Sequence, residues 1–293
     1  MSVNNVNNND VTIASSAVLV DLTIRGWTAK KQDKEVSDEV GQNKGATNRA
    51  GVYQKNLLAG SGQLDDITKY AAIIRQWHNW NTLPWSDSGT RLLPAARLQE
   101  YMAQYGAHEA EYNRRVQEFV NEYTLLVQAA QFSLGAMFKA DDYPDPSEIP
   151  AKFEMRSAVY PLPETGDFRV DIGNQGLSEL REQFARQQDA RLNEAMTEVR
   201  SRVKSSLEKI SKQLRVDENG KKGRIHDVTI ESALELCDAL DGFNLTRDVE
   251  IEELKSNIRM VLTGYEPAEL RKDEVVRKYM KEEVDALLDK FAW

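Results

Sequence analysis

Apolar side chains recur every three or four positions through two long stretches of the chain, residues 94–138 and 176–214. This spacing places them on one face of a helix as a continuous apolar seam. A seam kept over so many turns is typical of a coiled coil or a long helical hairpin. We therefore predict two long helices, the first of which begins at Pro94 because proline suits the first turn of a helix.

Residues 18–24 follow a different period, since apolar and polar side chains alternate there and several are β-branched. Alternation of this kind predicts a half-buried β-strand. Residues 153–160 and 167–172 predict two further strands joined by a turn rich in proline and glycine, and residues 52–58 predict a short one. Residues 82–94 are rich in turn-forming residues and predict a connector.

Shorter helices are predicted at residues 64–79, 227–240, 247–262 and 267–291. Gly242 and Gly264 stand where C-terminal caps are expected. Turn-forming residues at 217–223 suggest a boundary, and the Asn-rich start suggests a flexible tail. We therefore predict three parts: a disordered tail at residues 1–12, a small sheet with the long helical hairpin at residues 13–216, and a C-terminal helical subdomain at residues 224–293.

Together these elements predict an α+β protein that is mostly α. The two long helices would pair as a long antiparallel, coiled-coil-like hairpin, because the strands between them return the chain. A small antiparallel β-sheet would lie at the base of the hairpin, and a C-terminal helical bundle would complete the fold. The hydrophobic content of 41% is enough for a packed core.

The net charge of −9 is unevenly distributed. Residues 176–226 hold 12 basic and 8 acidic side chains, whereas residues 227–293 hold 9 basic and 17 acidic ones. The basic segment could complement the acidic one within the chain or contact another subunit. A net-acidic chain argues against nonspecific DNA binding. No stretch approaches the roughly 20 apolar residues of a membrane-spanning helix, so we expect no membrane association.

The chain lacks a P-loop, a dinucleotide glycine fingerprint, HExxH, paired CxxC and GxSxG motifs. His78, His108 and His226 are too scattered along the sequence to form a local zinc site. The single cysteine, Cys237, excludes an intrachain disulfide, fits a reducing compartment, and is expected to be a buried small apolar residue. We predict no enzymatic activity, no cofactor and no metal.

Two groups of side chains are candidates for contact with a partner. The basic group could follow phosphates of a nucleic acid, or form a solvated face that meets an acidic partner. The aromatic group, which surrounds Trp77 and His78, could stack on bases or simply pack where a helix meets a loop. The candidate contact residues are Arg200, Arg202, Lys204, Lys209, Lys212, Arg215, Lys221, Lys222, Arg224, Trp80 and Trp85.

An acidic corner formed by Asp141, Asp142, Asp145 and Glu148 offers the oxygen ligands that divalent cations prefer. It lacks the spacing of a calcium loop, and two prolines restrict it. A solvated loop is the alternative interpretation.

Three groups of residues resemble a family of uncharacterised bacteriophage proteins. They are Leu22-Thr23-Ile24 with Trp27, Ala29 and Lys31; Thr82-Leu83-Pro84-Trp85 with Asp87, Gly89 and Arg91-Leu92-Leu93-Pro94; and Tyr143-Pro144 with Gly166-Asp167-Phe168-Arg169-Val170. The resemblance covers residues 17–215. Proteins of this family are encoded in podophages beside a MoxR-type AAA+ ATPase and a von Willebrand factor A-type protein. The resemblance supplies no catalytic residues.

The resemblance implies an accessory role in a phage-encoded ATPase module, in the cytoplasm of the infected bacterial host. The leading hypothesis is therefore a non-enzymatic adaptor or assembly protein that acts with those two partners. A nucleic-acid-binding protein of phage replication or recombination is one alternative, and a ring-forming structural phage protein is another. The sequence leaves homo-oligomerisation open.

Overall fold

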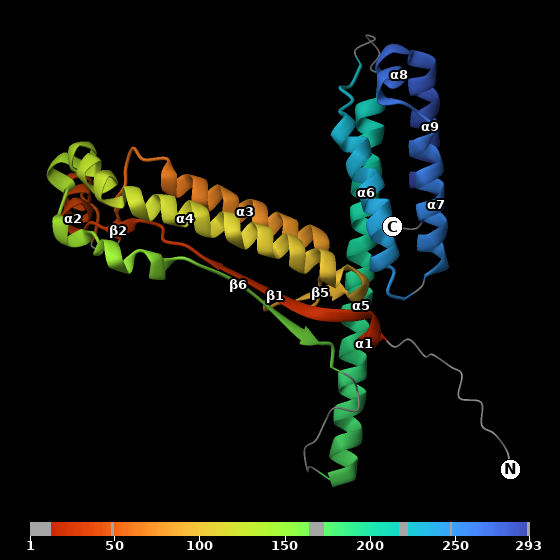
Figure 1. Cartoon of the computed structure of the whole chain (residues 1–293), viewed down its shortest axis with the longest axis horizontal. Coiled ribbons are helices and arrows are strands. Elements are labelled where there is room, and N and C mark those ends of the chain that lie inside the picture. The colour runs from red at the N-terminus through yellow and green to blue at the C-terminus, as the bar shows by residue number, and fades with distance from the viewer. Residues whose placement is uncertain (1–12, 48–49, 164–172, 217–221, 247, 292–293) are drawn as a thin grey trace. The chain divides into compact units, whose positions relative to one another are not determined.

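A computed structural model describes residues 13–47, 50–163, 173–216, 222–246 and 248–291. The chain is mostly helical with a small antiparallel sheet, as predicted (Figure 1). It divides into two compact units. Unit 1 contains the described residues of Met1–Asp21, Trp80–Glu100 and Ala158–Trp293, and unit 2 contains those of Leu22–Asn79 and Tyr101–Ser157.

The four-stranded sheet has the order β4-β5-β1-β6. Its strands are β1 (Ala17–Arg25), β4 (Leu83–Pro84), β5 (Arg91–Pro94) and β6 (Glu154–Pro161). The strands predicted at 18–24 and 153–160 are confirmed as β1 and β6. The strand predicted at 167–172 lies outside the described residues.

The connector predicted at 82–94 is wrong, because it contains β4 and β5. Pro94 closes β5 opposite Ala17 instead of opening a helix. Both strands bury a leucine completely, and proline is tolerated at strand ends, where no ladder hydrogen bond is lost. A 3₁₀ turn, η1 (Ala95–Arg97), follows, so the long helix begins only at Leu98.

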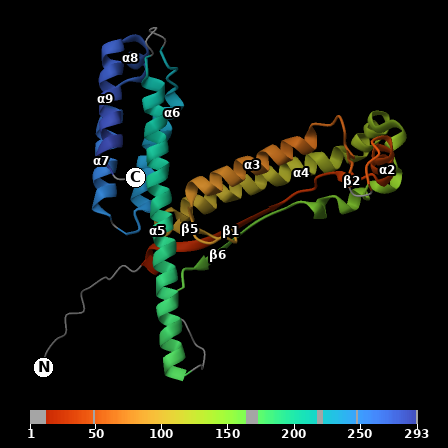
Figure 2. The same ribbon diagram turned by 180° about the vertical axis from the view of Figure 1, so that it is seen from behind.

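Unit 2 is built on α3 (Gln63–Asn81) and the long helix α4 (Leu98–Leu134), which lie side by side in both views (Figures 1 and 2). Trp77 of α3 stacks on Tyr101 with ring centroids 4.7 Å apart. At the other end of α3, the Gln63 amide donates to Glu122 at 3.0 Å. Residue numbers therefore rise on one helix as they fall on the other, and the two helices are antiparallel.

Shorter elements complete unit 2. They are β2 (Lys30–Gln32), α2 (Lys34–Asn43), β3 (Gln54–Asn56), and the 3₁₀ turns η2 (Gly135–Met137), η3 (Ala140–Asp142), η4 (Pro146–Glu148) and η5 (Pro150–Lys152). β2 and β3 form an antiparallel pair in which Lys31 lies opposite Lys55. The strand predicted at 52–58 is thus confirmed in a shorter form.

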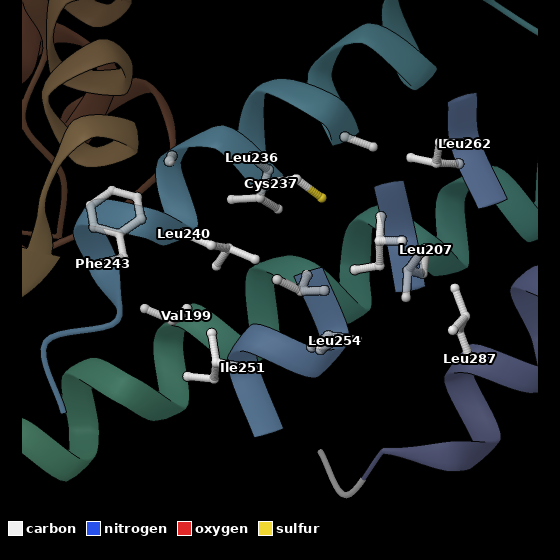
Figure 3. Packing of buried hydrophobic residues seen from close by; sticks show 14 of the residues in the cluster. Val199, Leu207, Leu236, Cys237, Leu240, Phe243, Ile251, Leu254, Leu262 and Leu287 are labelled. Atoms are coloured by element: carbon white, nitrogen blue, oxygen red, sulfur yellow. The ribbon is translucent and has the colours of Figure 1, made fainter. Parts of the chain in front are cut away.

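The helical core of unit 1 consists of α5 (Gly173–Leu214), α6 (Asp227–Phe243), α7 (Val249–Thr263) and α9 (Glu274–Lys290). Helix α5 packs against both α6 and α9, and α7 packs against the same two helices. Figure 3 shows Val199 and Leu207 of α5 turned toward Leu240 of α6 and Leu254 of α7. The short helices α1 (Ile13–Ser16) and α8 (Pro267–Lys272) also belong to this unit.

The predicted pairing of the two long helices is not confirmed and needs correction. The seam of α4 is covered by α3 and other elements of unit 2, while the seam of α5 is covered by α6 and α9. The boundary near 217–223 is likewise misplaced, since α5 and the helices after it share one core. An apolar seam shows which face of a helix is buried, but it does not identify the partner.

The C-terminal helices differ from the prediction in two details. The single helix expected at 267–291 is split at Asp273, whose carboxylate caps α9 by accepting from the Val275 and Val276 amides at 2.8 and 3.2 Å. Gly264 ends α7 as predicted. Gly242 lies inside α6 instead, where a Cβ atom would come within 3.2 Å of the Arg97 side chain.

Candidate functional site

The basic segment of α5 begins with two arginines that are held inside unit 1. Arg200 bonds the carboxylate of Asp248 at 2.6 Å, which joins the basic helix to the acidic C-terminal segment. Arg202 pairs with Glu198 at 2.9 Å and donates to the carbonyl oxygens of Trp80 and Thr82. These two candidates therefore stabilise the fold, and the idea that basic and acidic segments complement each other is correct for Arg200.

Three of the following cations, Lys204, Lys209 and Lys212, lie on one broad side of α5, and Arg215 comes directly after its last residue; we call these four cations the cationic face. The last three are exposed and Lys204 is half-buried. Within the described residues no ion pair joins any of them to a carboxylate, and Glu208 is the one acidic side chain between Lys204 and Arg215. This arrangement leaves a locally positive surface on an acidic chain.

The remaining basic candidates lie between α5 and α6. Lys222 pairs with Glu274 at 3.4 Å, whereas Arg224 is exposed. Lys221 lies outside the described residues. Lys222 and Arg224 line a cavity of about 570 Å³, which we call the cationic cavity. The other residues that line it are Gly223, Ile225, His226, Asp227, Val228, Arg271 and Arg277.

Arg277 is the most unusual residue of the cavity, because its side chain is only 2% exposed and contacts no carboxylate in the described part of the chain. Its guanidinium donates to four backbone carbonyls: those of Gln213 and Leu214 at the end of α5, Leu270 in α8, and Gly223. Burial lowers the pKa of Arg277, and the nearby Glu274 opposes this effect. Arg277 thus places beside the cavity a positive charge that forms no ion pair within the described ranges.

The tryptophans divide between packing and exposure. Trp77 stacks on Tyr101, and Trp85 is buried in the core of unit 1 with Arg191 5.8 Å from its ring. Trp80 has a side chain that is 38% exposed. Packing therefore accounts for Trp77 and Trp85, and Trp80 keeps a ring that a partner could reach.

His78 and His108 each lie within hydrogen-bond distance of a tyrosine hydroxyl. The Nδ1 atom of His78 lies 2.8 Å from the Tyr101 hydroxyl, and that of His108 lies 2.9 Å from the Tyr70 hydroxyl. Burial lowers the pKa of His108, so its neutral form is favoured. Cys237 is buried as predicted, and burial raises its pKa to about 11, which leaves an unreactive thiol near neutral pH.

A buried lysine cluster, which we define as Lys55, Asp33 and Asp142, was missed by the sequence analysis. Lys55 in β3 is 3% exposed, and its Nζ lies 2.6 Å from Asp142 and 3.2 Å from Asp33. The same Nζ donates to the Met137 carbonyl at 2.7 Å. The ammonium thus lies close to three oxygen atoms, and its attraction to two carboxylates holds the charge in the interior.

The acidic corner is occupied by these interactions. Asp142 binds Lys55 and also Lys31, at 2.8 Å, while Asp145 accepts from the Ser147 amide and thereby caps η4. Burial raises the pKa of Asp142, but the hydrogen bonds from Lys31 and Lys55 outweigh it and the net pKa is lowered. The described residues contain no group of three His, Cys, Asp or Glu placed to hold a metal ion. The sequence held one signal for this cluster. Lys55 stands between Gln54 and Asn56 in a short polar strand, so it faces the opposite side from both, and a lysine on the buried side of a strand needs a carboxylate nearby.

Two apolar side chains are exposed on the second half of α4. Leu125 is 66% exposed and Phe132 is 90% exposed. They are two helical turns apart and so share one side of the helix. We call this pair the apolar ridge.

No family model matches the chain, and no curated protein or solved structure matches it either. Across the described ranges, no helix combines the length and the apolar character needed to cross a membrane. The resemblance to phage proteins stays a prediction.

Proposed function

We propose that the chain is a non-enzymatic adaptor or assembly protein that docks on another protein through the apolar ridge. The supporting observation is the exposure of Phe132, the most exposed large apolar side chain in the described residues, together with Leu125 on the same side of α4. Leaving such side chains in water is unfavourable, and neighbouring exposed apolar groups mark contact sites. Aromatic residues are also enriched at the centres of protein interfaces.

The proposed partners are a MoxR-type AAA+ ATPase and a von Willebrand factor A-type protein, in the cytoplasm of an infected bacterium. The resemblance of residues 17–215 to phage proteins encoded beside these two supports that choice. The ridge adds a physical reason to expect a protein partner.

The test is co-purification of the full chain with each partner, in the wild type and in the double variant Leu125→Ala/Phe132→Ala. Truncating two interface anchors removes about 2 kcal/mol each, so we expect recovery of the partner to fall by more than tenfold. Met102→Ala is the matched control, since Met102 is an exposed apolar residue elsewhere on the same helix. Recovery of neither partner by the wild type, or equal recovery by the double variant, would contradict the proposal.

The cationic face favours a second candidate, a nucleic-acid-binding protein. The four cations of this face, three in α5 and one directly after it, could each neutralise a phosphate and release a counterion. A mobility shift with single-stranded DNA should then be strong at low salt and weaken for Lys209→Gln/Lys212→Gln. A wild-type chain that leaves DNA unshifted at low salt would remove this candidate.

A further inference from the structure

The cationic cavity contains more positive charge than its own carboxylates can balance. Arg271 pairs with Asp227, and Lys222 pairs with Glu274. Arg224 has no ion pair within the described residues, and Arg277 is bound only by backbone carbonyls. Among the described residues, four permanent cations thus pair with or lie near two carboxylates, which leaves a net attraction for an anion at this cavity.

The backbone of the cavity adds to this attraction. Helix α6 has 17 residues, and its N-cap, His226, makes no side-chain capping bond. His226, Asp227 and Val228 all line the cavity. The first amide groups of a helix lack intrahelical acceptors and carry partial positive charge, so they complement the cationic side chains.

The loop that carries Lys222 and Arg224 is fixed at its start. Lys222 forms an antiparallel bridge with Val216, and the Gly223 amide donates to the Arg215 carbonyl at 2.9 Å. A Cβ atom at Gly223 would lie 2.5 Å from the Gln213 carbonyl oxygen, so only glycine allows this approach. The Gly223 carbonyl in turn accepts from Arg277. The backbone at Lys222 and Gly223 is therefore held in place before a ligand binds, which lowers the entropy cost of binding there.

We infer that the cationic cavity binds the phosphate group of a small ligand, either inorganic phosphate or the phosphate of a nucleotide. Arginine side chains suit the task, because a guanidinium can donate two hydrogen bonds to one phosphate. A volume of about 570 Å³ leaves room for a nucleoside attached to the phosphate. This inference is independent of the proposed adaptor function, since it concerns different residues.

The experiment is isothermal titration of the full chain at low ionic strength with inorganic phosphate, AMP and adenosine. We expect phosphate and AMP to bind and adenosine not to bind. If only inorganic phosphate binds, the inference holds and the ligand is the free anion. No binding of either phosphate compound, or equal binding of AMP and adenosine, would overturn it.

Substitutions locate the site. Arg224→Gln should weaken phosphate binding roughly tenfold, because it removes an exposed cation that no carboxylate offsets. Lys209→Gln on the cationic face is the matched control with the same change in charge, and it should leave the affinity unchanged. Equal weakening by both variants would show a diffuse field instead of a site and would overturn the inference. The inference would also be overturned if a long oligonucleotide bound more tightly than AMP and if both variants lost this binding equally.

Discussion

Lys55→Met is expected to lower the free energy of unfolding of unit 2 by about 3–5 kcal/mol, because it leaves the buried carboxylate of Asp33 without its lysine and leaves Asp142 with Lys31 as its remaining cation. The Lys55 ammonium lies within 3.2 Å of both Asp33 and Asp142, and burial keeps water from replacing it. Methionine has a similar volume, so the effect comes from charge and not from a cavity. Urea denaturation followed by circular dichroism measures the change.

Lys69→Met is the matched control. Lys69 is exposed and lies 3.8 Å from the exposed carboxylate of Asp66, so its loss should cost less than about 1 kcal/mol. The double variant Lys55→Met/Asp142→Leu should recover part of the stability, since it removes one of the two carboxylates that lost their contact with Lys55. Equal stability of Lys55→Met and Lys69→Met would show that the cluster is solvated.

The pH dependence of the same variant gives a second readout. The Val36 amide and Lys55 lower the pKa of Asp33, and the lysines lower that of Asp142 despite its burial. Both carboxylates therefore stabilise the fold above their unfolded pKa of about 4, and this contribution is lost as pH falls through the lowered values. The gap between the wild type and Lys55→Met should shrink toward about pH 4, where unpaired carboxyls take up protons.

At alkaline pH the dependence has the opposite sign, because the contribution of Lys55 to stability is lost as pH rises. Burial alone would lower the pKa of Lys55, but the hydrogen bonds to Asp142 and Asp33 outweigh it and the net pKa is raised. Its contribution is fully present below the unfolded lysine value of about 10.4, and it is lost as pH rises through the higher folded value. Wild-type stability from this cluster should therefore be constant between about pH 5 and pH 10.

The elements that sequence predicts well here are those with a long local period. Helix α3, both long helices and strand β1 were found because apolar residues repeat along them over several turns or pairs. Strand β5 has four residues and its neighbour β4 has two, and each strand ends in a proline, so they offer too few alternations to be recognised. Periodicity also says nothing of partners, which is why α4 and α5 were wrongly paired with each other.

The candidate residues illustrate the same limit. The sequence shows that Arg200 is basic, but its partner Asp248 is distant in the chain and only the fold brings them together. Lys55 looks like an ordinary polar residue, because the two aspartates that bury it come from separate segments. Composition identified the charges correctly, and tertiary structure decided which of them remain exposed.

Arg277→Met is expected to lower the free energy of unfolding of unit 1 by about 3–5 kcal/mol, a loss comparable to breaking a buried charge network. Arg277 donates to the Gln213 and Leu214 carbonyls in the last turn of α5. Carbonyls in the last turn of a helix receive no hydrogen bond from an amide of the same helix, so they need a donor from elsewhere. Methionine would leave these carbonyls, and that of Gly223, buried without donors. Urea denaturation of the full chain measures the loss.

The choice of variants separates hydrogen bonding from charge. Arg277→Lys keeps the positive charge but cannot reach four carbonyls that surround a planar guanidinium, so its stability should lie between the wild type and Arg277→Met. Arg259→Met is the control, because Arg259 is exposed and pairs with the exposed Asp238. If Arg277→Lys were as stable as the wild type, the charge alone would matter. If Arg277→Met matched Arg259→Met, the end of α5 would not depend on Arg277, and the fixed geometry of the Gly223 loop would need another cause.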